Sequence, residues 1–292
     1  MVPMVMKSER RRLSSWFIHH RIWVQLSFLA VWLLPLGGRL HGVCAPVFHC
    51  YACPLATFAC PIGVLAQFSA LHVFPFIAVG VLVLVGSAFG TLVCGWACPF
   101  GLLQDAAGKI PTPKFDLPRW TGYFRYVVLV GAVLAIPYFF GEHHPLFVCR
   151  FCPAGVLEAG VPNIVKQAAA RAPINWPNAI KLAVLGIFLV AIFFVRRPWC
   201  RIFCPLGAIF SLFNRASAFV LRLDPAACTD CKRCHRLCKF GIEPEKSPNA
   251  LACIRCLECT KCGPGALKLQ TIFGKQPTAV GQAGIGSPSA RP

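Results

Sequence analysis

Acidic residues are scarce in this chain, and its long apolar stretches contain none. Only 10 of 292 residues are Asp or Glu, against 29 Lys or Arg. Proton pumps and ion carriers need ionisable groups inside their membrane spans, so both classes are excluded. Charged residues amount to 13% of the chain, too few to cover an ordinary soluble domain. The net charge of +19 comes without a basic recognition motif, which excludes nucleic acid as a partner.

The apolar content predicts a multi-pass membrane protein. Hydrophobic residues make up 57% of the chain, and the mean hydropathy is +0.63. Four apolar runs are long enough to be predicted as spans: 22–36, 71–93, 126–140 and 179–195. Lys and Arg gather at 1–21, 109–125 and 196–222, which predicts that both termini are cytoplasmic. The first run is followed by no convincing cleavage site, so we expect a retained anchor.

Eight of the eighteen cysteines form two runs near the C-terminus. The first run has the spacing C-x2-C-x2-C-x3-C, and the second repeats it with a last gap one residue shorter: Cys228, Cys231, Cys234, Cys238, then Cys253, Cys256, Cys259, Cys262. This spacing is typical of two 4Fe–4S clusters that exchange their fourth ligands. One cluster is then held by Cys228, Cys231, Cys234 and Cys262, and the other by Cys253, Cys256, Cys259 and Cys238. Zinc is the alternative. It binds well to isolated C-x2-C pairs, and the third cysteine of each run would have no role in such a site.

The apolar part of the chain is internally repeated. CPIGVLAQ at Cys60 resembles CPAGVLEA at Cys152, and CGWACPFG at Cys94 resembles CRIFCPLG at Cys200. A repeat of this kind predicts two related hairpins whose like motifs meet on the same side. The inner pair of motifs then brings together four thiols, the number that a 4Fe–4S cluster requires: Cys94, Cys98, Cys200 and Cys204. The alternative is that C-x3-C merely packs small side chains between helices.

A second group of cysteines is predicted on the outer side of the membrane. It contains Cys50, Cys53, Cys60, Cys149 and Cys152, with Cys44 left over. The repeat favours a fourth metal cluster here, whereas an oxidising exterior favours disulfides, and the sequence leaves both open. The same side carries residues that could accept protons from a quinol: His41, His49, Glu142, His143, His144 and Glu158.

These observations predict the fold class and the domains. We expect an all-α membrane domain at 1–222, with four transmembrane helices arranged as two repeated hairpins. A small ferredoxin-like domain with two 4Fe–4S clusters follows at 223–270, and 271–292 is expected to be a disordered tail because it is rich in Gly, Pro, Ser and Gln. A further helix at about 156–170 is expected at the membrane interface.

The combined motifs resemble the ferredoxin-type polyferredoxin membrane proteins of the NapH, MauN and NosR kind. The resemblance covers about residues 10–269 and is closest to the membrane subunit of the quinol-oxidising module that serves periplasmic nitrate reductase. It implies a bacterial inner-membrane protein that passes electrons between the quinol pool and soluble iron–sulfur or cytochrome partners. The chain departs from the family pattern in its more numerous outer cysteines and in its shortened second ferredoxin run.

Three functions are compatible with these features. The first is an electron-transfer subunit, such as a quinol dehydrogenase subunit of an anaerobic respiratory system, whose chemistry belongs to its clusters. The second is a regulatory or maturation factor that reduces a metal centre or thiols of another respiratory enzyme. The third is a membrane anchor for a soluble iron–sulfur partner. For none of these three functions does the sequence identify a catalytic residue.

Overall fold

The computed structural model describes residues 20–33 and 60–273, apart from 116, 175, 239 and 263–265. The first part of the chain is helical: α2 (Arg21–Leu33), α4 (Pro61–Ala70), α5 (Phe76–Phe89), α6 (Leu92–Trp96), α7 (Pro99–Ala107), η2 (Arg119–Tyr123), α8 (Phe124–Val128), η3 (Leu129–Ala135) and α9 (Ile136–Phe140). The second part repeats this character: α10 (Val148–Phe151), α11 (Pro153–Gly155), η4 (Val156–Gly160), α12 (Val161–Ala169), α13 (Ala179–Phe194), α14 (Pro198–Ile202), α15 (Pro205–Leu212) and η5 (Phe213–Arg215). The C-terminal elements are short: β1 (Phe219–Leu223), η6 (Pro225–Ala227), α16 (Arg233–Leu237), η7 (Glu258–Lys261) and β2 (Leu267–Thr271).

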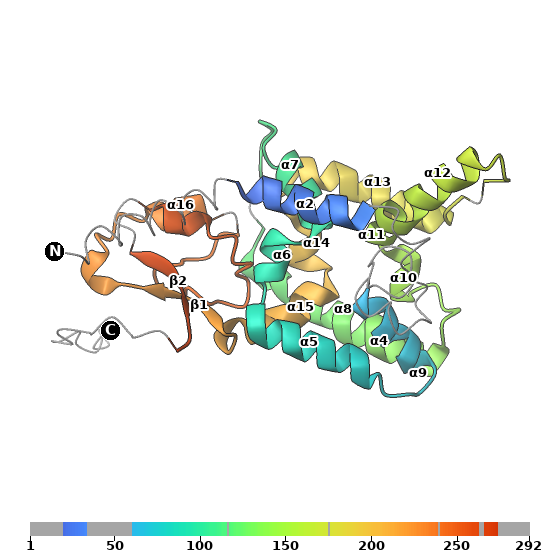
Figure 1. Ribbon diagram of the computed structural model, residues 1–292, viewed down its shortest axis with the longest axis horizontal. Helices are drawn as coiled ribbons and strands as arrows, with labels where there is room; N and C mark the ends of the chain where they lie inside the picture. Colours follow the sequence, from blue (N-terminus) through green and yellow to red (C-terminus); the bar gives the residue numbers. More distant parts are fainter. Residues whose placement is uncertain are drawn as a thin grey trace, which may run out of the picture.

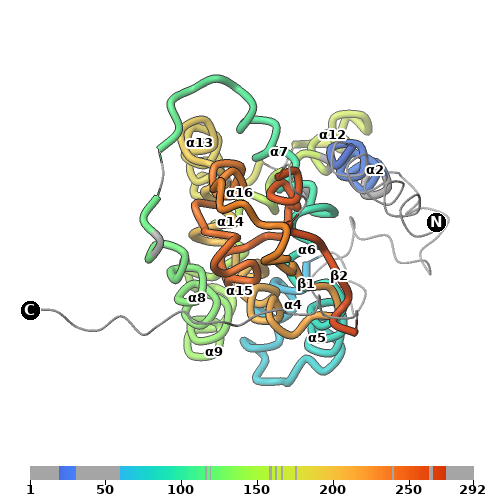
Figure 2. The backbone as a smooth tube through the Cα atoms, turned by 90° about the vertical axis from the view of Figure 1, so that its left-hand side faces the viewer, coloured from blue at the N-terminus to red at the C-terminus, as the bar shows by residue number. Residues whose placement is uncertain are grey.

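The helices and the C-terminal elements occupy opposite ends of the molecule. Figure 1 shows β1, β2 and α16 at one end, and the apolar helices α5, α9 and α13 extending away from them. Figure 2 views the molecule from the end that the C-terminal elements occupy. The cysteine-bearing helix α6 lies at the end of the helical part that faces the C-terminal unit, where Gly95 approaches Ile254 (Figure 1).

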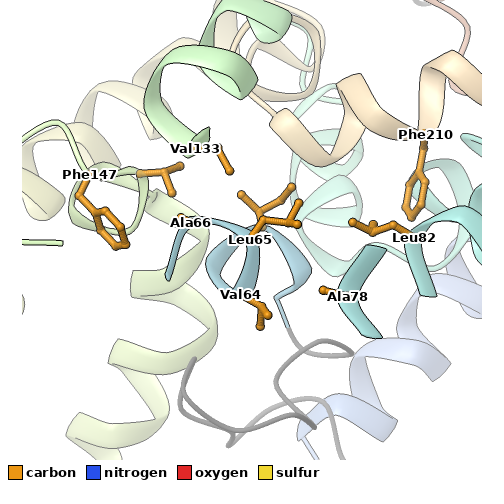
Figure 3. Close-up of a cluster of buried hydrophobic side chains, with 10 residues drawn as sticks. Val64, Leu65, Ala66, Ala78, Leu82, Val133, Phe147 and Phe210 are labelled. Atoms are coloured by element: carbon orange, nitrogen blue, oxygen red, sulfur yellow. The ribbon is translucent and has the colours of Figure 1, made fainter. Parts of the chain in front are cut away.

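Helix α4 lies at the centre of the helical part. The five consecutive residues 62–66 are all buried and carry no polar side chain, which is the pattern of a helix buried in a core. Figure 3 shows Val64, Leu65 and Ala66 of α4 among Leu82 of α5 and Phe210 of α15. Segments from both halves of the repeat thus share one core.

The predicted spans are only partly present as long helices. Among the described residues, one helix is long and apolar enough to cross a membrane, and it runs over Trp120–Phe140. The predicted span at 71–93 is interrupted, because helix α5 starts after Pro75 and ends at Gly90, whose φ is +57°. Helices α5 and α13 have 14 and 16 residues, fewer than the roughly 20 that a straight span needs. Of the predicted first span, the described part is α2, with 13 residues.

The C-terminal unit is closed by a two-stranded antiparallel sheet. Phe219 pairs with Thr271 and Leu223 pairs with Leu267, so the strands bracket both ferredoxin runs. Strand β1 crosses the domain boundary predicted at 222–223, and its pairing places it with the C-terminal unit. Most of the predicted tail, residues 274–292, lies outside the described residues.

Candidate iron–sulfur sites

Four thiols from both ferredoxin runs line one cavity in the C-terminal unit. They belong to Cys238, Cys253, Cys256 and Cys259. The remaining walls are largely apolar and include Leu221, Phe240 and Ile242. Cys238 comes from the first run and the other three from the second, which is the predicted exchange of fourth ligands. A cavity with four thiols and apolar walls fits the ligand set and the dry surroundings of a 4Fe–4S cluster.

The other four ferredoxin cysteines form a second group, to which helix α16 contributes Cys234. The thiols of Cys231 and Cys262 lie close enough to each other to interact electrostatically. Cys262 also lies within electrostatic range of Cys228, and Cys234 lies within range of Cys262. This group again combines three cysteines of one run with the last cysteine of the other. Cys231 is exposed, whereas Cys234 and Cys262 are buried.

Burial raises the pKa of several thiols in the C-terminal unit. It raises the pKa of Cys253 to about 12, and it also raises the pKa of Cys259. Burial raises the pKa of Cys234 to about 11, with a further contribution from Glu245, whose Oε2 accepts a hydrogen bond from the thiol at 3.3 Å. Ligation requires thiolates, so loading these sites must release protons.

The described cysteines are not paired with one another in disulfides. All fifteen cysteines within the described ranges are free thiols. Within those ranges, no three His, Cys, Asp or Glu side chains converge closely enough to hold one metal ion.

The two inner motifs have the same local structure and bring their cysteines together. Cys98 and Cys204 are the N-cap residues of α7 and α15, each followed by a proline at the first helical position. Cys94 lies within electrostatic range of Cys98 and Cys200, and Cys204 lies within range of the other three. Gln104 donates a hydrogen bond from Nε2 to the Sγ of Cys200 at 3.1 Å. The structure thus gathers the predicted inner set, and cluster binding there stays a prediction.

The loop that carries Cys253 and Cys256 is attached directly to the first inner motif. Trp96 donates from Nε1 to the carbonyl of Arg255 at 3.2 Å, and Thr91 donates from Oγ1 to the carbonyl of Cys253 at 2.8 Å. A Cβ atom on Gly95 would lie 2.7 Å from the carbonyl oxygen of Ile254, which only glycine avoids. The backbone that bears Cys94 therefore touches the backbone that bears Cys253.

Buried charges at this contact were not predicted from the sequence. Arg197 and Arg21 both bind Asp105, and the three side chains are 2%, 4% and 5% exposed. Arg255 is fully buried and donates to the carbonyl of Phe89 at 3.2 Å and to Ser217 at 2.5 Å. The available signal was Asp105 itself, because it is an acidic residue within an otherwise apolar cysteine motif.

The outer set is only partly described. Cys44, Cys50 and Cys53 lie outside the described residues, as do His41 and His49. Cys60 and Cys149 approach each other around Gly63, where a Cβ atom would lie 3.5 Å and 3.6 Å from their sulfurs. Cys149 is also within electrostatic range of Cys152.

The polar residues of the same side are arranged around the end of α9. Gln67 donates from Nε2 to Glu142 Oε2 at 2.8 Å, and His143 lies 3.8 Å from the same carboxylate. The side chain of His143 is 89% exposed, while the side chain of Glu158 lies outside the described part.

A family model described as a 4Fe-4S binding domain matches residues 71–118 and 179–223. Each matched stretch contains one C-x3-C-P motif, so the match falls on the repeat and not on the ferredoxin runs. No solved structure matches the chain.

Several curated proteins are similar over most of the chain. An uncharacterized protein of Methanocaldococcus jannaschii is 31% identical over 207 residues, which cover 67% of this chain and 79% of that protein. The putative electron transport protein YccM of Escherichia coli is 24% identical, with 68% of this chain and 54% of YccM covered. The ferredoxin-type protein NapH of Escherichia coli is 26% identical, with 63% and 62% covered.

Two further relatives carry names of the same kind. They are the methylamine utilization ferredoxin-type protein MauN of Methylorubrum extorquens and the regulatory protein NosR of Stutzerimonas stutzeri. The chain spans only 24% of the length of that NosR. With the 4Fe-4S family model and the coverage of its relatives, the chain belongs to the family of ferredoxin-type iron–sulfur proteins that includes NapH, MauN and NosR.

Proposed function

We propose that this protein is a membrane electron-transfer protein that passes electrons between the quinol pool and a soluble redox partner. The observation that carries the proposal is the direct contact between two predicted cluster sites, the inner set and the cavity of Cys238, Cys253, Cys256 and Cys259. Bound clusters would supply one-electron transfer, and this chain's residues would hold them, exclude water and set their spacing.

The membrane placement is supported by the exposed apolar side chains. Phe76, Phe139 and Ile187 are 77%, 75% and 70% exposed on α5, α9 and α13. Apolar surface of this extent marks a membrane or partner interface. We propose that these helices, with α2, form a multi-pass unit in a bacterial inner membrane. Both termini would be cytoplasmic, which places the C-terminal unit on the side where cysteines stay reduced.

A route through the protein is supported by one apolar cluster that both membrane-side cysteine groups contact. Phe100, Phe188 and Trp199 form its buried centre, and the rings of Phe100 and Phe188 stack with centroids 4.7 Å apart. Cys98 and Cys204 of the inner set pack against this cluster, as does Cys152 of the outer set. We propose a fourth cluster at the outer set, with disulfides as the alternative.

The exit toward a soluble partner is proposed at the cluster of Cys228, Cys231, Cys234 and Cys262. Cys231 is exposed there, whereas Cys253 and Cys259 of the neighbouring site are buried. An iron–sulfur or cytochrome partner could approach this cluster closely, and the membrane helices lie at the opposite end (Figure 1).

The proposal is tested by adding a quinol to the anaerobically purified protein and following cluster reduction by EPR. We expect reduction that a quinone analogue inhibits. Clusters that are reduced by dithionite but never by any quinol would contradict the quinol role.

A regulatory or maturation role is the second candidate, because NosR is named a regulatory protein. In that case, deletion of the protein would leave the metal site of a client enzyme defective, while the purified protein would show no quinol turnover.

A further inference from the structure

Three charged side chains are buried between the inner motif and the C-terminal unit. Arg197 donates from Nε to Oδ1 of Asp105 at 2.9 Å and from Nη2 to Oδ2. Arg21 donates from Nη2 to the same Oδ2. Two buried cations therefore share one carboxylate. Buried charges are costly unless they are balanced, so the remaining positive charge calls for another negative group.

The surroundings of Arg197 show which groups could balance it. Its Nη1 donates to the carbonyl of Cys94 at 3.3 Å, and its guanidinium is within electrostatic range of Cys200 and Cys256. Cys94 and Cys200 belong to the inner set, whereas Cys256 belongs to the neighbouring cavity. Arg197 thus lies between the two predicted cluster sites. Glu258 lies 3.9 Å from Arg21 and is farther along the same network.

A 4Fe–4S cluster with four thiolate ligands is negatively charged, and reduction adds one more negative charge. A guanidinium stays charged at every relevant pH, and in surroundings of low dielectric constant its field is weakly screened. A fixed positive charge beside such a cluster therefore favours the reduced form.

We propose that Arg197, fixed by Asp105, is a positioning residue that raises the reduction potentials of both the inner cluster and the cluster at Cys238, Cys253, Cys256 and Cys259. One guanidinium near both clusters would shift both potentials in the same direction, so it would stabilise an electron on either cluster without greatly changing the difference between them. This inference rests on the proposed function, because it requires that both sites hold clusters.

The test compares two variants, one that removes a positive charge and one that removes a negative charge. The potentials of all clusters would be measured by EPR-monitored redox titration of the full chain, purified anaerobically. Arg197→Gln removes a positive charge and should shift both potentials downward. Asp105→Asn removes a negative charge and should shift both upward. The cluster at Cys228, Cys231, Cys234 and Cys262 should keep its potential in both variants.

Two further variants separate a field effect from a structural one. Arg197→Lys keeps the charge and should leave the potentials much closer to those of the unchanged protein. Arg222→Gln removes a charge from β1, where the guanidinium donates to the carbonyl of Ile272 at 3.1 Å, and should shift neither of the two potentials. If Arg197→Gln fails to assemble, Asp105→Asn decides: an upward shift of both potentials supports the inference, and an unchanged or lowered potential at either cluster overturns it.

Shifts of the same sign in Arg197→Gln and Asp105→Asn would overturn the inference, as would unchanged potentials with full iron content. Failure of the proposed inner site would look different. In that case the unchanged protein would itself lack the inner cluster, and the cavity cluster would still report the effect of Arg197.

Discussion

Gly95 determines how closely the inner motif and the ferredoxin loop approach each other. Added to its backbone, a Cβ atom would lie 2.7 Å from the carbonyl oxygen of Ile254 and 3.3 Å from that of Arg255. Both neighbours are backbone atoms, which cannot rotate away as a side chain can. The loop between two predicted cluster ligands, Cys253 and Cys256, would have to shift as a whole.

We therefore expect Gly95→Ala to destabilise the contact by about 1–3 kcal/mol, the usual cost of overpacking. Amide hydrogen exchange in residues 253–256 should become faster. Gly80→Ala is the matched control, because Gly80 lies within α5 and no described atom lies within 4 Å of its added Cβ. That change should leave exchange unaltered, and equal exchange in both variants would show that the close approach is unimportant.

The sequence allowed prediction of the cysteine groups but not of the charges around them. The spacing of the cysteines from Cys228 to Cys262 indicates which thiols share a cluster, because two runs of this spacing exchange their fourth ligands. The pairing of Asp105 with Arg21 and Arg197 joins residues 84 and 92 positions apart. No short-range pattern encodes such a pair, so it emerges only from the packing of α2 and α13 against α7, with Arg197 in the turn between α13 and α14.

At the scale of elements, the repeat is visible as a recurring helix start. Cys60, Cys152 and Cys204 are each an N-cap residue followed by proline. The sulfur of Cys204 accepts a hydrogen bond from the backbone N–H of Gly207 at 3.3 Å, and Cys60 accepts one from Gly63 at 3.4 Å. The cysteine thus satisfies one of the free N–H groups at the beginning of its helix.

We therefore expect Cys204 both to bind the inner cluster and to cap helix α15, and the two roles can be separated by substitution. Cys204→Ser and Cys204→Ala should both abolish the inner cluster, measured as iron content. Serine can still cap α15, whereas alanine cannot, so the apoprotein with alanine should be about 1 kcal/mol less stable to urea in detergent.

Cys94 provides the control for this comparison. It lies inside α6 and not at a helix start, so serine there should be no more stabilising than alanine. A serine advantage of the same size at both positions would contradict the capping role of Cys204.

The lengths of the helices were predicted less well than their positions. By hydropathy, residues 71–93 read as one apolar stretch. The helix within it is shorter, because it begins after Pro75 and ends before Gly90, whose φ is +57°. By contrast, the helix over Trp120–Phe140 is longer than the apolar run predicted at 126–140. The aromatic and polar residues at 120–125 form its first turns. Hydropathy alone registers neither effect.

At the scale of the whole molecule, the cysteine groups form a series from the apolar helices to the exposed end. The inner set approaches the cavity site through Gly95, and the remaining ferredoxin group includes the exposed Cys231. We expect Cys231→Ser to disturb the last member of this series and to leave the others in place. The variant should lose the EPR signal of one cluster, while membrane insertion and the inner cluster are retained. Unchanged iron content would contradict the assignment of Cys231.

The orientation of the series in the membrane can be tested separately. Reporter fusions should place residue 263 in the cytoplasm and the loop around Cys53 outside, because Lys and Arg gather on the cytoplasmic side. A periplasmic signal from the C-terminal fusion would reverse the inner and outer assignments used above.

The most direct test of the account is the iron and sulfide content of the anaerobically purified chain, with and without the inner cysteines. The simultaneous change of Cys94, Cys98, Cys200 and Cys204 to serine should remove about four iron atoms per chain, the content of one 4Fe–4S cluster. The two ferredoxin clusters should remain, with their EPR signals intact. Identical iron and sulfide contents in the unchanged and the altered protein would contradict the inner cluster and the electron route that depends on it.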